Sequence, residues 1–257
     1  MVLDFSKNNG VGVLKFNRPD KFNSFTRELA LAVQQALDDC EADDAIRVIV
    51  LTGEGKAFCA GQDLVEATDP NGPPLKEIVK KHYNPIIERI RAIEKPIIAA
   101  VNGVAAGAGA NIALACDVVI AKQSAKFIQA FSAIGLIPDS GGTFFLPRLI
   151  GMQKAMALML TGDRISAEEA EAMNMIYKAI EDEGFDTYVT SFANKVALMP
   201  TLGLGLTKRA LNATFENDLQ QQLALEEELQ TLAGSSHDFK EGTTAFLEKR
   251  KPVFKGK

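Results

Sequence analysis

Apolar residues recur with two spacings over the first part of the chain. Alternating apolar positions over residues 11–16 predict a short strand. Helical spacing of apolar residues over 27–40, behind a capping Thr26, predicts a helix. The continuous apolar run 48–51 is typical of a parallel strand that is covered on both faces. The chain therefore begins with a βαβ-like arrangement.

Strands and helices continue to alternate up to about residue 140. We expect a helix over 75–93, a buried strand over 97–101, a helix that follows the small residues 103–110, and a strand over 118–120. The segment 68–74 contains three of the ten prolines, so it reads as a surface loop. This alternation predicts an α/β core.

Strand signals nearly vanish after residue 140. Residues 166–169 form a capping box that opens a helix, and residues 223–232 continue the helical character. No internal repeat is present, which argues against a solenoid. The pattern predicts one α/β core with a helical C-terminal extension.

Composition and charge exclude several classes of protein. The 257 residues are 47% hydrophobic and 24% charged, as in an average globular protein. The formal net charge of -5 disfavours nucleic-acid binding. No apolar run is long enough to span a bilayer, and the first residues do not resemble a signal peptide, so we expect a cytoplasmic protein without a membrane partner.

The three cysteines are odd in number and widely spaced. Cys40, Cys59 and Cys116 have no histidine nearby, a pattern that fits neither a disulfide framework nor a zinc site. We interpret them as reduced, small hydrophobic residues, and we expect no metal site. His82 and His237 stand in polar, helix-like surroundings and are expected at the surface.

Two glycine-rich segments, 58–64 and 102–111, each follow a predicted buried strand. Small residues let a ligand approach the backbone, and free peptide N–H groups at a helix N-terminus can bind negative charge, so two such turns could form an oxyanion hole. Two alternatives stay open. The small residues could serve only close packing of a helix on a sheet. A dinucleotide site is disfavoured, because Ile112 stands where its third glycine belongs.

Six segments together resemble the crotonase, or enoyl-CoA hydratase/isomerase, superfamily over essentially the whole chain. No single segment is specific, but their joint order and spacing are. They are residues 16–19 (FNRP), 57–63 (AFCAGQD), 95–103 (KPIIAAVNG), 135–143 (GLIPDSGGT), 160–165 (LTGDRI) and 246–252 (FLEKRKP).

The resemblance implies a fold, an assembly and a ligand. The expected fold is a spiral of ββα turns over residues 1–200, followed by a helical trimerisation region over 201–257. The expected assembly is a homotrimer or a dimer of trimers. The expected ligand is an acyl-coenzyme A thioester, with coenzyme A as part of the substrate and no separate cofactor.

The resemblance also assigns binding residues. By the family pattern, the backbone N–H groups of Gln62 and Ala108 would bind the thioester oxygen. The loop from Ala60 through Asp63 to Leu64 would border the adenine and pantetheine of coenzyme A. Fixed backbone dipoles of this kind stabilise the negative charge that forms when a thioester enolises.

The chain departs from the hydratases at both catalytic glutamates. The matching positions are Asn111 and Phe131, and neither side chain can move a proton. The usual hydration mechanism needs two carboxylates, so ordinary hydratase activity is not expected. Phe131 would instead make the acyl pocket apolar, which suits an aromatic or alicyclic acyl group.

Asp139 is the one carboxylate in a matching catalytic segment. The sequence around it is similar to the ring-1,2-epoxyphenylacetyl-CoA isomerases of aerobic phenylacetate breakdown, which are thought to use this aspartate as acid and base. A dry pocket would raise the pKa of Asp139 toward a range useful for proton transfer. The alternative is that Asp139 only caps the helix that follows it.

These observations favour an acyl-CoA isomerase. The expected reaction converts ring-1,2-epoxyphenylacetyl-CoA to its oxepin, with Δ3-Δ2 enoyl-CoA isomerisation as a second activity. Two alternatives stay open: a hydratase-like enzyme that acts on another acyl-CoA, and a non-catalytic crotonase-like binding subunit.

Overall fold

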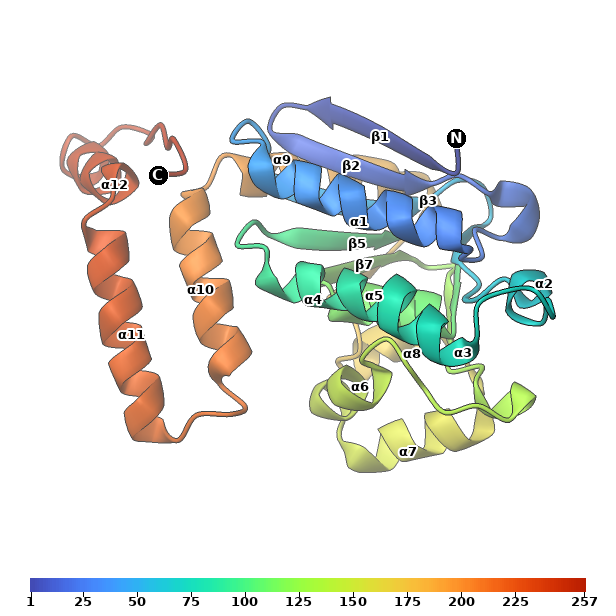
Figure 1. The fold of residues 1–257 in the computed structure, drawn as a ribbon. Helices are drawn as coiled ribbons and strands as arrows, with labels where there is room; N and C mark the ends of the chain where they lie inside the picture. Colours follow the sequence, from blue (N-terminus) through green and yellow to red (C-terminus); the bar gives the residue numbers. More distant parts are fainter.

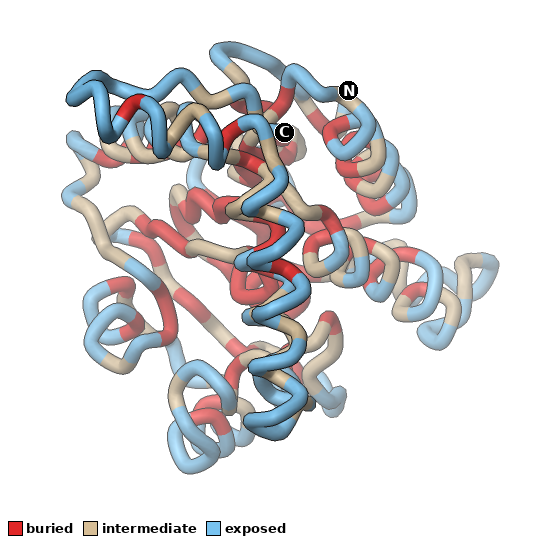
Figure 2. Tube along the Cα trace, turned by 90° about the vertical axis from the view of Figure 1, so that its left-hand side faces the viewer, coloured by how far each residue is buried: buried red, intermediate tan, exposed pale blue.

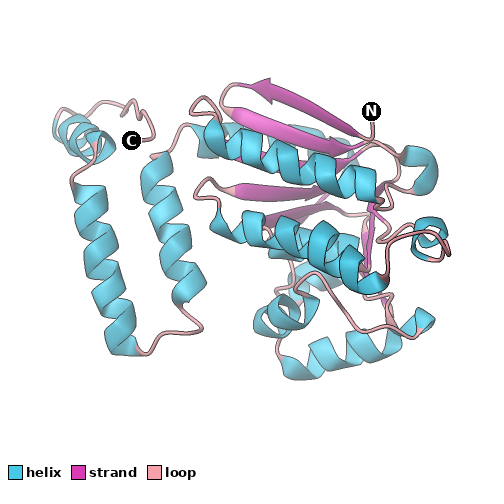
Figure 3. Ribbon diagram, viewed as in Figure 1, coloured by secondary structure: helices cyan, strands magenta, loops and turns pink.

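The computed structural model describes residues 1–257, which form two β-sheets surrounded by helices (Figure 1, Figure 3). The larger sheet has six strands in the order β1-β2-β3-β5-β7-β10, with bounds Leu3–Asn8, Val11–Phe16, Val48–Gly53, Ile97–Val101, Val118–Lys122 and Lys178–Ile180. The smaller sheet has the order β4-β6-β8-β9, with bounds Ala57–Cys59, Val104–Ala106, Lys126–Ile128 and Arg164–Ser166. Neighbouring strands are parallel except in the pairs β1–β2 and β8–β9.

Consecutive strands of the chain enter different sheets. In the pairs β3–β4, β5–β6 and β7–β8, the first strand joins the larger sheet and the second joins the smaller one. Helices follow each pair and lead to the next, so the chain winds as a spiral of ββα turns, as expected.

The helices fall into three sets. Those before β7 are η1 Pro19–Lys21, α1 Arg27–Ala42, α2 Leu64–Ala67, α3 Leu75–Glu77, the π-helical η2 Ile78–Tyr83, α4 Asn84–Ala92 and α5 Ala108–Ala115. Those from β8 to α9 are η3 Ser132–Ile134, α6 Gly142–Ile150, α7 Met152–Thr161, α8 Ala167–Ala172, η4 Asp182–Gly184 and α9 Phe185–Ala197. The last three are α10 Thr201–Ala213, α11 Leu219–Gly234 and α12 His237–Leu247. None of the helices combines the length and apolarity needed to cross a bilayer.

Most local predictions are confirmed, and the missed elements are short or exposed. Thr26 accepts a hydrogen bond from the Leu29 N–H and caps α1, and Ser166 and Glu169 form the capping box of α8. Strand β1 was missed because only Leu3 on it is buried, which leaves no apolar alternation. Strands β9 and β10 have three residues each, too few to show a period.

The larger sheet is covered on both faces, and Figure 2 shows its buried residues at the centre of the molecule. One face contributes to a core of 41 residues together with α1, α4 and α5. The other face packs against α9, where Val48 and Val50 meet Phe185 and Val189. Burial on both sides explains the continuous apolar run of β3.

Helices α10 to α12 stand to one side of the sheets (Figure 1). Helix α10 is fastened to the core by the buried Lys208, whose Nζ donates to the Ile90 carbonyl and lies 2.8 Å from an Asp117 carboxylate oxygen. Helix α10 begins at Thr201, and residues 201–257 contain the last three helices. The role of that region in assembly stays a prediction.

Helix α5 packs closely on β4, so the close-packing role considered for the second glycine-rich segment applies to Gly109. A Cβ atom on this residue would lie 2.4 Å from the carbonyl oxygen of Cys59 and 2.7 Å from its Sγ. Both atoms belong to a buried strand and cannot move away cheaply. Gly109 therefore sets how near α5 comes to β4.

We expect Gly109→Ala to lower the free energy of unfolding by about 3 kcal/mol, because the added methyl overpacks the core. Urea unfolding followed by circular dichroism measures this change. The matched control is Gly234→Ala, also at a helical position, where an added Cβ meets nothing within 4 Å. The control should be neutral or up to about 1 kcal/mol more stable. Equal stability of the two variants would contradict the packing account.

Candidate active site

The two glycine-rich segments lie side by side. Strands β4 and β6 pair in parallel, so both segments leave the smaller sheet at the same edge. Gly61 has φ +90°, and a Cβ atom on it would lie 3.0 Å from the Ala106 carbonyl oxygen and 3.6 Å from the Ala108 amide nitrogen. The geometry brings the peptide groups of Gln62 and Ala108 together, although 46 positions separate them in the sequence.

The two amides are available as donors. The Gln62 N–H donates to no acceptor of the chain. Ala108 is the first residue of α5, so its N–H has no carbonyl one turn earlier in the helix, and the preceding Gly107 has no side chain to cap it. Free N–H groups at such a place favour bound negative charge.

The first segment is held by an ion pair beneath it. Arg18 donates from Nη2 to Asp63 Oδ2 at 2.9 Å, and Asp63 Oδ1 accepts from the Val65 N–H and caps α2. Burial works to raise the pKa of Asp63, but Arg18 outweighs it and the pKa lies below its ordinary value. Ala60 and Leu64, by contrast, are exposed at the surface of the segment.

Tyr83 is a site residue that the sequence did not reveal. Its side chain is 1% exposed, and its hydroxyl donates to Gln62 Oε1 at 2.6 Å. It lies in the π-helical turn η2, which has no signature in the apolar spacing. Tyr83 thereby joins the helical layer to the first glycine-rich segment.

The surface location expected for His82 is wrong. The residue is 3% exposed, because the wider π turn directs both His82 and Tyr83 inward, and its Nδ1 has no hydrogen-bond partner. Burial lowers the pKa of His82. His237 is exposed, as expected.

Asp139 lies in the loop between η3 and α6 with a half-buried carboxyl group. Burial raises its pKa, and the weaker opposing effect is the Ser140 hydroxyl, which donates to Asp139 Oδ1 at 2.9 Å. No cationic side chain pairs with this carboxylate. Its pKa is therefore displaced toward neutral pH.

The alternative that Asp139 caps a helix is wrong. Helix α6 begins at Gly142 behind Gly141, and no side chain caps it. Only the backbone carbonyl of Asp139 takes part, by accepting from the Gly142 N–H at 2.9 Å. The carboxyl group accepts from the Ser140 hydroxyl and does not bond to the amides of α6.

Asn111 and Phe131 lie beside these groups. Asn111 donates from Nδ2 to the Asp139 carbonyl at 2.9 Å and accepts at Oδ1 from Gln129 Nε2, also at 2.9 Å. Phe131 is 6% exposed, and its ring edge lies 3.8 Å from where a Cβ on Gly107 would be. The structure thus places an apolar ring at the start of α5, and Asn111 connects the same helix to the backbone of Asp139.

Nucleophilic thiol chemistry does not fit this site. The three cysteines are free and buried, as expected. Burial raises the pKa of Cys59, which lies in the first glycine-rich segment, to about 12, so it is a neutral thiol at physiological pH.

No group of three or more potential metal ligands occurs in the chain.

The chemistry available here follows from two kinds of group. The free amides can stabilise an oxygen that becomes negative, and the carboxyl group of Asp139 can accept and return a proton. Together they suit a reaction that passes through an enolate.

Comparison with known proteins gives a consistent result. Residues 6–257 match the family model described as enoyl-CoA hydratase/isomerase. The 1,2-epoxyphenylacetyl-CoA isomerase of Escherichia coli K12 is 49% identical over 251 residues, which cover 96% of each chain. A Rhodobacter capsulatus protein named "Probable enoyl-CoA hydratase" is 44% identical over 248 residues, covering 96% of this chain and 95% of the relative.

Solved structures agree with the fold. The crystal structure of enoyl-CoA hydratase from Bacillus anthracis superposes with a TM-score of 0.93 at 33% identity and covers 100% of both chains. The crotonase fold expected from the sequence is thereby confirmed.

We expect Asp139→Asn to stabilise the protein at pH 8 by about 1 kcal/mol and to have little effect near pH 4. Burial raises the pKa of Asp139 in the folded state above its value in the unfolded chain. The folded state therefore loses stability relative to the unfolded state as the pH rises from the unfolded pKa through the folded pKa. An asparagine carries no such charge. Urea unfolding at both pH values tests this, with the exposed Asp163→Asn as control. A stabilisation that does not change with pH would contradict the burial account.

Proposed function

The chain belongs to the enoyl-CoA hydratase/isomerase family, and we propose that within it this protein is an acyl-CoA isomerase. The observation that carries the proposal is the half-buried carboxyl group of Asp139, which has no cationic partner and lies in a loop that is hydrogen-bonded to the helix supplying the free Ala108 N–H. The positions where the resemblance would put the hydratase glutamates hold Asn111 and Phe131, which cannot transfer protons.

The amides of Gln62 and Ala108 bind the thioester oxygen in this proposal. When a proton leaves the carbon beside the thioester, the electron pair moves onto that oxygen. Each fixed donor then contributes about 3 kcal/mol to the stability of the enolate. Support comes from the contact of Gly61 with the backbone of residues 106–108, which sets the two peptide groups next to each other.

Asp139 moves the proton. Its carboxylate removes a proton from C2 of a Δ3-enoyl thioester, and the acid so formed returns the proton to C4 as the enolate collapses to the Δ2 product. One group acts as base and then as acid, so no water is added and no second carboxylate is needed. Burial supports this role because a raised pKa brings the acid and base forms closer in energy at neutral pH.

We propose 2-(1,2-epoxy-1,2-dihydrophenyl)acetyl-CoA as the physiological substrate, with its oxepin as product. The similarity to the E. coli 1,2-epoxyphenylacetyl-CoA isomerase supports this choice. The buried ring of Phe131 supports an apolar acyl pocket. Coenzyme A enters as part of the substrate, and the exposed Ala60 and Leu64, with Asp63 between them, border its pantetheine and adenine.

A hydratase acting on another acyl-CoA is the second candidate. The name of the Rhodobacter capsulatus relative favours it, since that protein is 44% identical to this chain. Addition of water to crotonyl-CoA distinguishes the two candidates, because hydration requires an activated water that Asn111 and Phe131 do not provide.

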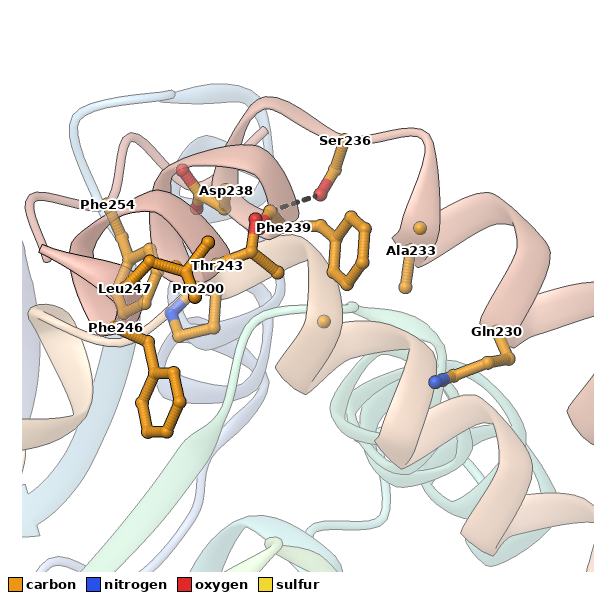
Figure 4. Close-up of a pocket in the computed structure, with 13 residues that line it drawn as sticks. Pro200, Gln230, Ala233, Ser236, Asp238, Phe239, Thr243, Phe246, Leu247 and Phe254 are labelled. Atoms are coloured by element: carbon orange, nitrogen blue, oxygen red, sulfur yellow. Dashed lines mark hydrogen bonds between the residues drawn. The ribbon is translucent and has the colours of Figure 1, made fainter.

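We also propose that residues 201–257 form an oligomerisation region that builds a homotrimer or a dimer of trimers. A pocket of about 570 Å³ lies among α10, α11 and α12, and Phe239, Phe246 and Phe254 are among its lining residues (Figure 4). Exposed apolar side chains continue along the same helices, at Leu211, Leu219, Leu223, Leu232, Phe246 and Leu247. So much apolar surface is costly in a monomer, which supports a covering copy of the chain.

We expect Asp139→Asn to lower kcat for Δ3-Δ2 isomerisation by about 10³-fold, within the usual contribution of a general acid–base group. Coenzyme A thioester binding, measured by calorimetry, should stay within about twofold because the amides are unchanged. Full activity of the variant would disprove the role of Asp139. Robust hydration of crotonyl-CoA by the unmodified protein would favour the second candidate.

We expect the protein to sediment as a trimer or hexamer and Phe246→Glu to shift it toward monomers, because the substitution places a charge in a desolvated apolar contact. Analytical ultracentrifugation at several concentrations measures both. Leu31→Glu on α1, also an exposed apolar position, is the control and should leave the mass unchanged. A monomeric parent protein would refute the assembly.

A further inference from the structure

The backbone of Asp139 is held by a relay of two buried amide side chains. Gln129 donates from Nε2 to Asn111 Oδ1, and Asn111 donates from Nδ2 to the Asp139 carbonyl oxygen, both at 2.9 Å. Asn111 is fully buried and Gln129 is 2% exposed. Neither amide can transfer a proton, and burying such a group is costly unless it is hydrogen-bonded, as Asn111 is at both ends of its amide.

The direction of the relay follows from the chemistry of its last member. A backbone carbonyl can only accept, so Asn111 must turn its NH₂ group toward Asp139. The Asn111 oxygen then faces Gln129, which must present its own NH₂ group. An acidic side chain at 111 in its ionised form has no hydrogen to donate, and it would repel the Asp139 carbonyl.

Asn111 also belongs to the helix turn that supplies the Ala108 donor. Its N–H donates to the Gly107 carbonyl at 3.1 Å, which closes the first turn of α5. Its side chain packs on α6, where a Cβ on Gly142 would lie only 2.3 Å from Asn111 Nδ2. One residue therefore connects the turn that carries the Ala108 N–H to the loop that carries Asp139.

We propose that Asn111, oriented by Gln129, is a positioning residue that fixes Asp139 relative to the Ala108 N–H. This inference rests on the proposed function, since it assigns Asp139 the proton transfer and Ala108 the oxyanion. The distance between an acid–base group and an oxyanion donor decides whether both reach one thioester at once. A displacement of about 1 Å can lower a rate by about 10²-fold.

The chain offers a matched control for this relay. Asn217 donates from Nδ2 to Gln222 Oε1, and Gln222 donates from Nε2 to the Ala210 carbonyl. This second relay also ends on a backbone carbonyl, but it joins α10 to the start of α11 and includes no residue of the α5 turn or the Asp139 loop. Substitutions in the control relay show what the loss of any such relay does to the protein. Substitutions at Asn111 and Gln129 show what the loss of the relay to Asp139 does in addition.

The experiment compares substitutions that keep the shape and remove the hydrogen bonds. Asn111→Leu interrupts the first relay, and Gln222→Met interrupts the control relay at the matching place. Gln129→Met is a milder second variant that removes only the outer bond, so the test survives if Asn111→Leu fails to fold. Its own control is Asn217→Leu.

We expect Asn111→Leu to lower kcat by about 10²-fold with KM within about twofold, and Gln129→Met to lower it by about tenfold. Gln222→Met and Asn217→Leu should keep the parent values. Parent kcat in both site variants would overturn the proposal. An equal loss in the site and control variants would overturn it as well, because the effect would then be general.

Titration of Asp139 followed by carboxyl carbon NMR, assigned with Asp139→Asn, gives a readout that does not require turnover. Burial is the main cause that raises the Asp139 pKa, Tyr83 of η2 is a neighbouring titratable group, and no cation pairs with the carboxylate. Release of the loop to water should therefore lower the Asp139 pKa in both site variants, but not in the controls. An unchanged titration in the site variants would overturn the positioning role.

The same measurements separate the two levels of the proposal. If the parent protein isomerises no acyl-CoA, the proposed function fails, while a pKa that falls only in the site variants still supports the holding of Asp139. If the parent is active and the site variants match it in rate and titration, the positioning role fails alone.

Discussion

The site depends on how closely α5 approaches β4. The contact of Gly109 with Cys59 leaves no room for a side chain, and the contact of Gly61 with residues 106–108 is nearly as tight. This approach places the start of α5 beside the first glycine-rich segment, and so sets two peptide groups from distant parts of the chain next to each other. It also fixes where the side chain of Asn111 begins, and thereby how far α5 can reach toward the loop of Asp139.

The same packing makes the site polar at a few atoms and apolar elsewhere. Phe131 and Tyr83 are buried, and the half-buried carboxyl group of Asp139 has no cationic partner. Such a group costs stability when it is charged, and the same burial raises its pKa above the ordinary value of an aspartate. Arg18 and Asp63 show the opposite arrangement, in which an ion pair keeps a carboxylate charged and serves the loop rather than the reaction.

The sequence predicted those helices and strands in which apolar residues recur at a regular spacing, and those residues that match a family motif. The strand over 48–51 and the cap at Thr26 were predicted because apolar spacing and capping chemistry are local properties. The burial of His82 and the contact of Tyr83 with Gln62 were not predicted, because a π turn changes which residues face inward without changing the composition. The relay through Gln129 was also hidden, since it joins residues from three separate segments.

The fit of Asn111 against Gly142 limits how this site could have changed during evolution. An ionised glutamate at 111 would have no hydrogen to donate to the Asp139 carbonyl, which now accepts one from Asn111. A second carboxylate at 111 would therefore also affect Gln129, which donates to Asn111, and the nearby backbone of Gly142. The free-energy effects of substitutions at 111, 129 and 142 should therefore be non-additive, because these residues are in contact.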